Sequence, residues 1–189
     1  MNVTLAFERV LFDSSAIVNF VEAGEIVRLS TYIGAKGAIT LDVEHELLRL
    51  SQTRFPGLIA LQRLAWPPGE ALTLPPRLLQ EAEDMRRVEL GPGAHADKDR
   101  GEVATALMAQ HLGNAVAVME DDFGKRICAR RNIPRMSTAQ LAAELVEAGA
   151  LDADSGFAVF SLATPSDVGM PEFKSALQNV RTELSKRSS

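Results

Sequence analysis

Several features that would point to particular functions are scarce or missing in this sequence. The only cysteine is Cys128, so the chain can form no internal disulfide, and a zinc site built on paired cysteines is excluded. No apolar run is long enough to cross a bilayer, so we expect no membrane span. The first residues lack a basic start followed by an apolar stretch, so we expect no secretory signal and a cytoplasmic location.

Aromatic residues are also few, at 5% of the chain, so Leu, Val, Ile and Ala must supply most of the core. Acidic residues outnumber basic residues, 25 to 20, so the net charge is −5. This balance is awkward for a nucleic-acid enzyme, because phosphate backbones are usually contacted by Lys and Arg. Such an enzyme would need clustered acids that hold cations, which reverse the local charge, or bases gathered on one face.

What is present is an alternation of strand-like and helix-like segments. Short strands are predicted at 9–13, within 35–40, at 115–119 and at 133–138, and 71–74 and 157–162 are further candidates. Helices are predicted at 14–24, 25–33, 42–52, 58–65, 78–88, 102–113 and 137–148, and residues 120–133 are predicted to form a turn followed by a helix. The alternation favours an α/β fold with three layers, α/β/α, and a mostly parallel central sheet of about five strands.

The end of the chain differs in character from the rest. We expect one domain over residues 1–150 and a C-terminal extension over residues 151–189. Within the extension, Pro171 suits the first turn of a helix, and Phe173, Leu177, Val180 and Leu184 would share one face of it. An amphipathic helix of this kind would dock on its own domain, on a second copy or on an inhibitor.

Acidic residues occur where a parallel sheet would bind ligands, beyond the carboxyl ends of its strands. Asp13 ends the first strand, and Asp121 and Asp122 follow the strand at 115–119. Glu46 lies in the helix after the second strand, and Glu102 opens a helix after a loop. Each has a structural explanation when taken alone, because acids are favoured in turns and in the first turn of helices.

Taken together, these acids point to metal chemistry. Carboxylates brought to one sheet edge repel one another, and without a cation some would have to take up protons. Hard divalent ions such as Mg²⁺ or Mn²⁺ relieve the repulsion and prefer oxygen ligands. Such ions also activate water and stabilise the charge that develops on a phosphodiester, so the pattern favours hydrolysis of a nucleic-acid backbone.

Three stretches resemble the PIN-domain ribonucleases. VLFDSSAIVNF resembles their opening strand, in which an Asp is followed by a small hydroxyl residue. AITLDVEHELLRL is similar to their second motif, a strand leading to a helix whose Glu precedes Leu. GEVATALMAQHLGNAVAVMEDDFGKRICARRNIP is similar to the best-marked part of the family, with Gly-Glu, a strand, Asp-Asp and a basic helix. The resemblance covers the chain from residue 9 to residue 148.

The resemblance implies a PIN-like fold and a metal-dependent endoribonuclease. It implies that Mg²⁺ or Mn²⁺ is held by an acidic quartet, which also forms the catalytic set: Asp13, Glu46, Glu102 and Asp121. Asp122 matches an auxiliary acid of the Asp-Asp pair, and Ser15 matches the hydroxyl residue near the first Asp. Glu44 is the alternative to Glu46 at the second position, and Asp99 is the alternative to Glu102 at the third.

Basic residues near the acids are candidates for RNA contact. Lys125, Arg126, Arg130 and Arg131 lie in the helix after the Asp-Asp pair, and the alternative for them is a solvated helix face. The commonest bacterial setting of the family, toxin–antitoxin pairs, implies two kinds of protein partner. One is an antitoxin segment that carries an Arg into the acidic groove, and the other is a second copy in a homodimer or larger assembly.

Two other functions fit parts of the pattern. A non-catalytic PIN-like module would bind RNA or protein, but it would gain nothing from keeping like charges together. A Mg²⁺-dependent phosphotransfer domain also uses an Asp after an early strand. However, the phosphatase pattern needs a second Asp two residues later, where this chain has Ser15, and a receiver domain needs its acid pair early.

Overall fold

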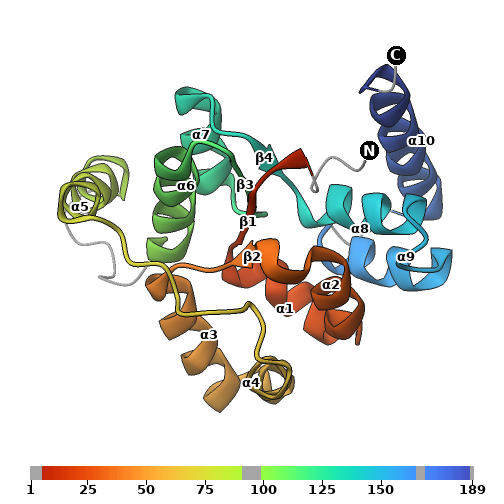
Figure 1. The fold of residues 1–189 in the computed structure, drawn as a ribbon, viewed down its shortest axis with the longest axis horizontal. Coiled ribbons are helices and arrows are strands. Elements are labelled where there is room, and N and C mark those ends of the chain that lie inside the picture. The colour runs from red at the N-terminus through yellow and green to blue at the C-terminus, as the bar shows by residue number, and fades with distance from the viewer. Residues whose placement is uncertain (1–5, 91–98, 165–168, 188–189) are drawn as a thin grey trace.

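Four short strands lie side by side in parallel at the centre of the molecule (Figure 1). The structure is a computed structural model that describes residues 6–90, 99–164 and 169–187. The strands are β1 (Arg9–Phe12), β2 (Gly37–Ala38), β3 (Ala115–Val118) and β4 (Arg135–Met136). Their order is β2-β1-β3-β4, and the register places Phe12 opposite Val118 and Leu11 opposite Ala38.

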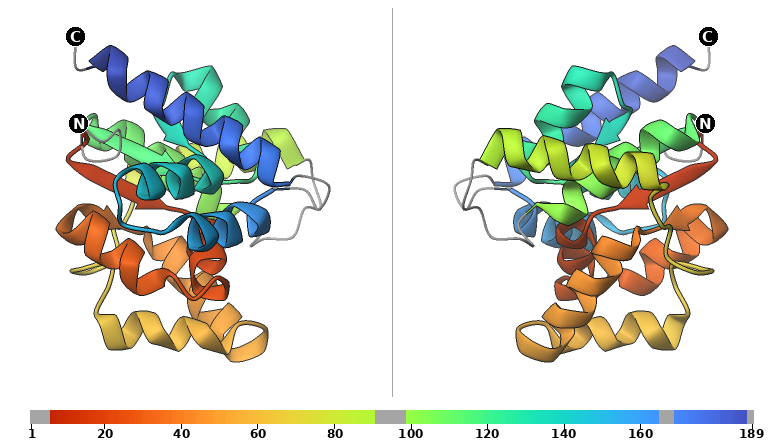
Figure 2. Two further views of the ribbon diagram at one scale, coloured as in Figure 1. Left: turned by 90° about the vertical axis from the view of Figure 1, so that its right-hand side faces the viewer. Right: turned by 90° about the vertical axis from the view of Figure 1, so that its left-hand side faces the viewer.

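Helices connect and cover these strands. In chain order they are α1 (Ser14–Glu22), α2 (Ile26–Ile33), the 3-10 turn η2 (Gly34–Lys36), α3 (Leu41–Thr53), the 3-10 turn η3 (Pro56–Leu58), α4 (Ile59–Leu64), α5 (Pro76–Leu90), α6 (Arg100–Leu112), α7 (Asp122–Arg131), α8 (Thr138–Glu147), α9 (Ala153–Leu162) and α10 (Met170–Arg187). Figures 1 and 2 show α5 and α10 on opposite sides of the molecule. The predicted α/β class with a parallel sheet is therefore confirmed.

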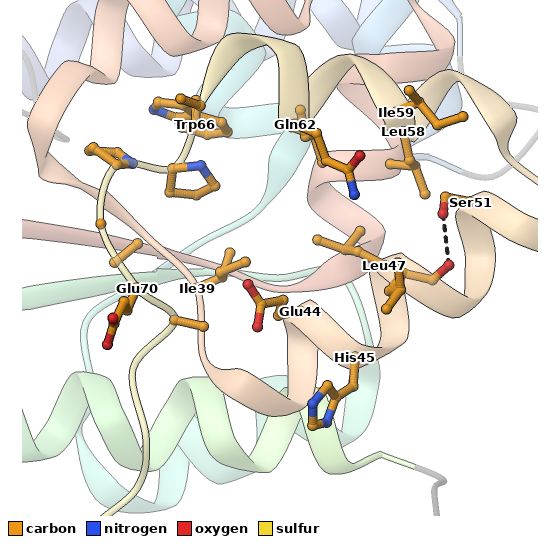
Figure 3. A pocket seen from close by; sticks show the side chains of 18 residues that line it. Ile39, Glu44, His45, Leu47, Ser51, Leu58, Ile59, Gln62, Trp66 and Glu70 are labelled. Atoms are coloured by element: carbon orange, nitrogen blue, oxygen red, sulfur yellow. Dashed lines mark hydrogen bonds between the residues drawn. The ribbon is translucent and has the colours of Figure 1, made fainter.

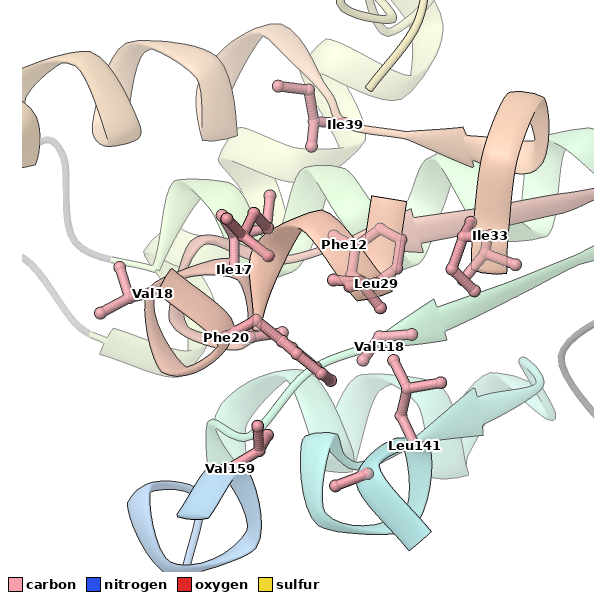
Figure 4. Packing of buried hydrophobic residues seen from close by; sticks show 14 of the residues in the cluster. Phe12, Ile17, Val18, Phe20, Leu29, Ile33, Ile39, Val118, Leu141 and Val159 are labelled. Carbon is pink, nitrogen blue, oxygen red and sulfur yellow. The ribbon is translucent and has the colours of Figure 1, made fainter. Parts of the chain in front are cut away.

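The buried residues of the strands are apolar or small because both faces of the sheet are covered there, whereas Arg9 and Arg135, at the starts of β1 and β4, are exposed. Val10, Phe12, Val116 and Val118 face a core shared with α1, α2, α3 and α8 (Figure 4). The residues between them, including Leu11, Ala115 and Ala117, face a second core shared with α6 and α7. Side chains of a strand alternate between faces, so this division fixes which helices cover which side of the sheet.

Two details of the strand prediction differ from the structure. About five strands were expected, whereas the described residues form four. Residues 71–74 form no strand, because only Leu72 pairs with the chain beside β2, in an isolated bridge with Thr40. Residues 157–162 belong to helix α9 and form no strand, because an apolar run of this length fits a buried helix equally well.

The C-terminal helices pack onto the domain itself. Phe173 is fully buried, and its ring centroid lies 5.1 Å from that of Phe160 and 5.8 Å from that of Phe157. Leu177 and Val180 are partly buried in the same cluster, which also includes Ala143 of α8. The helix predicted to start at Pro171 is confirmed, and Phe173, Leu177 and Val180 of its apolar stripe pack against α8 and α9. The side chain of Leu184, also predicted for this stripe, lies outside what the structure describes. No helix in the described part of the chain has the length and apolar character that crossing a membrane requires.

Candidate metal centre

The carboxylates gather at the place where the strand order reverses direction. From β1 the chain first adds β2 on one side, then returns to place β3 on the other side of β1. In open parallel sheets this reversal opens a crevice beyond the carboxyl ends of the two strands. Asp13 directly follows β1, and Asp121 lies three residues after the end of β3.

Asp13 is the most deeply placed of these acids, and it is fully buried. It is the N-cap of α1, and its Oδ2 accepts a hydrogen bond of 2.7 Å from the hydroxyl of Ser15. Its Oδ1 is buried and has no hydrogen-bond donor. The pKa of Asp13 is raised from 3.8 to about 6, mainly by burial; the hydrogen bond from Ser15 opposes this rise, and the charge of Glu46 adds to it. Ser15 therefore orients the carboxylate and leaves one oxygen for another ligand.

Glu46 approaches Asp13 across a glycine. Glu46 lies in the second turn of α3, whose Val43 and Leu47 are buried against the sheet. A Cβ built on Gly101 of α6 would lie 3.1 Å from Oε2 of Glu46 and 3.2 Å from Oδ1 of Asp13. Both carboxylates thus face the bare backbone at the start of α6, where a larger residue would push them apart.

Glu102 lies in the first turn of α6, next to Gly101. The pKa of Glu102 is raised from 4.5 to about 8, mainly by burial and then by the charge of Asp13, with smaller contributions from the charges of Glu46 and Asp121. The charges of Asp13, Glu46 and Asp121 all act on Glu102, so the four carboxylates lie in one neighbourhood. The raised pKa also means that Glu102 is largely protonated at neutral pH unless a cation is bound.

Asp121 and Asp99 lie close to Glu102 and extend the cluster of carboxylates. Asp121 is the N-cap of α7, and its Oδ1 accepts a hydrogen bond of 2.6 Å from the amide of Phe123. Carboxylate oxygens of Asp99, Glu102 and Asp121 all lie within 4.8 Å of one another. Asp99 and Glu102 were alternatives for one position in the sequence, and the structure places both at the cluster.

These residues fit a hard divalent cation. Every donor is a carboxylate oxygen, which is the ligand that Mg²⁺ and Mn²⁺ prefer. Two oxygens on opposite sides of such an ion are about 4 Å apart, which is compatible with the spacing of Asp99, Glu102 and Asp121. The donor-free Oδ1 of Asp13 is a second, independent indication, because a buried charge is normally paired with a donor or a metal.

Two other predicted acids lie away from this group. Glu44 is exposed on another face of α3 and lines an apolar cavity with Leu47 and Trp66. The side chain of Asp122 is 85% exposed and forms an ion pair of 3.2 Å with Lys125. Their roles as alternative and auxiliary ligands stay predictions.

The four basic residues of α7 divide between two surroundings. Lys125 pairs with Asp122 in the first turns of the helix, and Arg126 stacks over the ring of Phe123 at 5.6 Å. Arg131 forms an ion pair with Glu81 of α5 and a hydrogen bond of 2.9 Å with Gln110. Arg130 and Arg131 both line a groove beside α5. Lys125 and Arg126 are thus the members of this set that lie nearest to Asp121 along the helix.

Sequence reasoning missed the polar pocket that opens beside the carboxylates. Its volume is about 310 Å³, and it is lined by Asp42, His45, Glu46, Arg49, Arg100 and Gly101. Arg100 donates to Asp42 at 3.1 Å and also lies 3.7 Å from Glu83. Arg49 and Glu46 are three residues apart on α3, a spacing that puts both on one helix face, so helical periodicity was the signal that could have found Arg49.

Comparisons with known proteins add no assignment to this geometry. No protein-family model matches the chain, and no curated protein matches it.

Proposed function

We propose that the protein is a metal-dependent endoribonuclease with a PIN-like α/β/α fold. The observation that carries the proposal is the meeting of Asp13, Glu46, Glu102 and Asp121 at one crevice, with a buried Asp13 oxygen that has no donor. The three stretches that resemble PIN-domain ribonucleases supply these same four acids. The resemblance supports RNA as the substrate, and the carboxylate cluster supports the metal.

The protein residues have separable roles in this proposal. A bound Mg²⁺ or Mn²⁺ would lower the pKa of a coordinated water and stabilise charge on the scissile phosphate. Asp13 would hold the ion from the end of β1, Glu46 from α3, and Glu102 and Asp121 from the starts of α6 and α7. Ser15 fixes the orientation of Asp13 through its 2.7 Å hydrogen bond. Because Glu102 has a pKa of about 8 without an ion, metal binding competes with its proton.

The test is cleavage of a labelled single-stranded RNA with Mn²⁺ by the native protein and by Asp13→Asn. The amide keeps the shape of the side chain and removes its charge, so cleavage should fall by about 100-fold or more. Asp154→Asn is the matched control, because Asp154 is exposed in the first turn of α9. It should cleave like the native protein, and circular dichroism should show the same fold for all three.

Other results would assign other functions. Equal cleavage by the native protein and Asp13→Asn would mean that the carboxylate cluster does not catalyse the reaction. RNA binding without cleavage in either protein would favour the non-catalytic binding module. Covalent labelling by a small phosphodonor such as acetyl phosphate would favour the phosphotransfer alternative.

A further inference from the structure

An apolar cavity lies between α3, α4 and the segment 65–71 (Figure 3). Its volume is about 440 Å³, within the range of about 300–1,000 Å³ that is typical of small-molecule sites. Leu47, Leu58 and Trp66 form apolar walls, and two polar side chains, Glu44 and Gln62, extend into the space from opposite sides. Mostly apolar walls with a few polar groups are the usual lining of a site for a small organic molecule.

The segment 65–71, which forms one wall of this cavity, is held at both ends by the chain around β2. At one end, the indole nitrogen of Trp66 donates to the carbonyl oxygen of Gly34 at 3.3 Å. At the other end, the amide of Leu72 donates to the carbonyl oxygen of Ile39 at 2.9 Å. Because these contacts are made within the chain, the cavity is formed without a ligand, as small-molecule sites usually are.

The charge inside this cavity is negative and has no partner in the described part of the chain. Glu44 and Glu70 both line the space, and neither side chain forms an ion pair or a hydrogen bond with another described residue. None of the described lining residues is a lysine or an arginine, and His45 is the only one that can carry a positive charge. The two carboxylates therefore favour a positively charged ligand over a neutral or a negative one.

Acids that line other hollows of the surface are balanced by arginines. Asp42 of the polar pocket pairs with Arg100 at 3.1 Å, and Glu81 in the groove beside α5 pairs with Arg131. The two carboxylates of the apolar cavity are also not in the described group of acids whose oxygens are close enough to share a metal ion. An organic cation fits this cavity better than a metal ion, because it also covers the apolar walls.

We propose that the cavity binds a small organic cation, in which an ammonium or guanidinium group is carried on an apolar body. The cationic group would donate hydrogen bonds to Glu44, Glu70 would add attraction from the opposite wall, and the amide oxygen of Gln62 can accept a further hydrogen bond. The apolar body would lie against Leu47 and Leu58. The inference goes beyond the nuclease function and does not depend on it, because none of the predicted metal-binding quartet lines the cavity.

Three probes with similar bodies and different charges test this preference. Phenethylamine, which is an ammonium ion near neutral pH, is compared with the neutral phenethyl alcohol and with the anion hydrocinnamate. Saturation-transfer NMR measures the Kd of each in metal-free buffer, and the fluorescence of Trp66, the only tryptophan in the chain, reports binding at this cavity. The ammonium ion should bind about fivefold or more tightly than the alcohol, and hydrocinnamate should bind most weakly.

Variants separate the charge from the apolar body. Glu44→Gln should remove most of the preference for the ammonium ion over the alcohol, and Glu22→Gln, at an exposed position on α1, should leave it unchanged. Leu48→Asn, at a lining position 47% exposed, should weaken the ammonium ion and the alcohol by a similar factor, because it removes apolar contact. Leu162→Asn, 45% exposed on α9, is its matched control.

The carboxylate cluster is the other place where a cation could bind, so Asp13→Asn is measured as well. This variant should bind the ammonium ion as the native protein does, whereas a loss of binding would place the ion at the cluster and overturn the proposal. The proposal is also overturned if the native protein binds none of the probes, if it binds the ion and the alcohol equally, or if Glu44→Gln keeps the difference between them. RNA cleavage is measured separately, so either result stands without the other.

Discussion

Replacing Glu102 by glutamine should stabilise the metal-free protein near neutral pH and also weaken its stabilisation by Mn²⁺. Burial, followed by the charge of Asp13, raises the pKa of Glu102 from 4.5 to about 8 in the folded protein. Between these pH values the folded protein binds more protons than the unfolded chain, so the contribution of Glu102 to stability is complete below about pH 4.5 and is lost as the pH rises through about 8. Each pKa unit corresponds to about 1.4 kcal/mol, so the loss at pH 7 is on the order of 2–3 kcal/mol after allowance for solvent screening.

Urea unfolding followed by circular dichroism measures both effects. In EDTA the native protein should be less stable at about pH 7.5 than at about pH 5, and Glu102→Gln should reduce this difference. Mn²⁺ at about 100 times its Kd should raise the free energy of unfolding of the native protein by roughly 2.7 kcal/mol, and that of Glu102→Gln by much less. Glu22→Gln, at an exposed position on α1, should behave like the native protein. The reasoning would be refuted if the metal-free variant were less stable than the native protein at about pH 7.5.

Two further substitutions test the geometry and the packing. Gly101→Ala should lower the affinity for Mn²⁺ by about 10- to 100-fold in calorimetry while changing the free energy of unfolding by less than about 1 kcal/mol, because the new Cβ would lie 3.1 Å from Glu46 Oε2 and 3.2 Å from Asp13 Oδ1. Gly169→Ala, whose Cβ would meet its neighbours at 3.6 Å, is the control, and equal affinity in both variants would contradict the prediction. Phe173→Ala should cost about 3–5 kcal/mol in urea unfolding, because the ring is fully buried between α8 and α9. Leu162→Ala, at a site 45% exposed, should cost much less, and a loss for Phe173→Ala as small as that for Leu162→Ala would contradict the prediction.

Much of the fold could be predicted because its signals are local. The apolar strands β1 and β3, the capping residues Ser137 and Asp13, and the stripe of α10 all follow from residue type and period. Residues 157–162 were misassigned as a possible strand because the partners of a short apolar segment are set by tertiary packing. Here Phe160 packs against Phe173 of α10, a contact that periodicity within the segment does not encode.

The candidate site divides in the same way. Asp13 and Asp121 were predictable from topology alone, because each follows an apolar strand and parallel strands end at one edge. The placement of Glu44 was not, because Glu44 and Glu46 are two residues apart on α3 and so point to different sides of the helix. Which side faces the sheet is decided by the burial of Val43 and Leu47, and that burial directs Glu46 toward Gly101.

A purely structural role explains only one of the two buried oxygens of Asp13, and it does not explain Glu102. Capping α1 needs one side-chain oxygen, and Oδ2 of Asp13 supplies it by accepting from Ser15. A serine or asparagine would cap the helix equally well without placing a charge in a fully buried position. The cap therefore leaves Oδ1 of Asp13 unexplained, and it does not account for Glu102, whose ionisation Asp13 and Glu46 both oppose. A cation at the crevice accounts for both features, since it would supply the missing partner of Oδ1 and offset the repulsion that raises the pKa of Glu102.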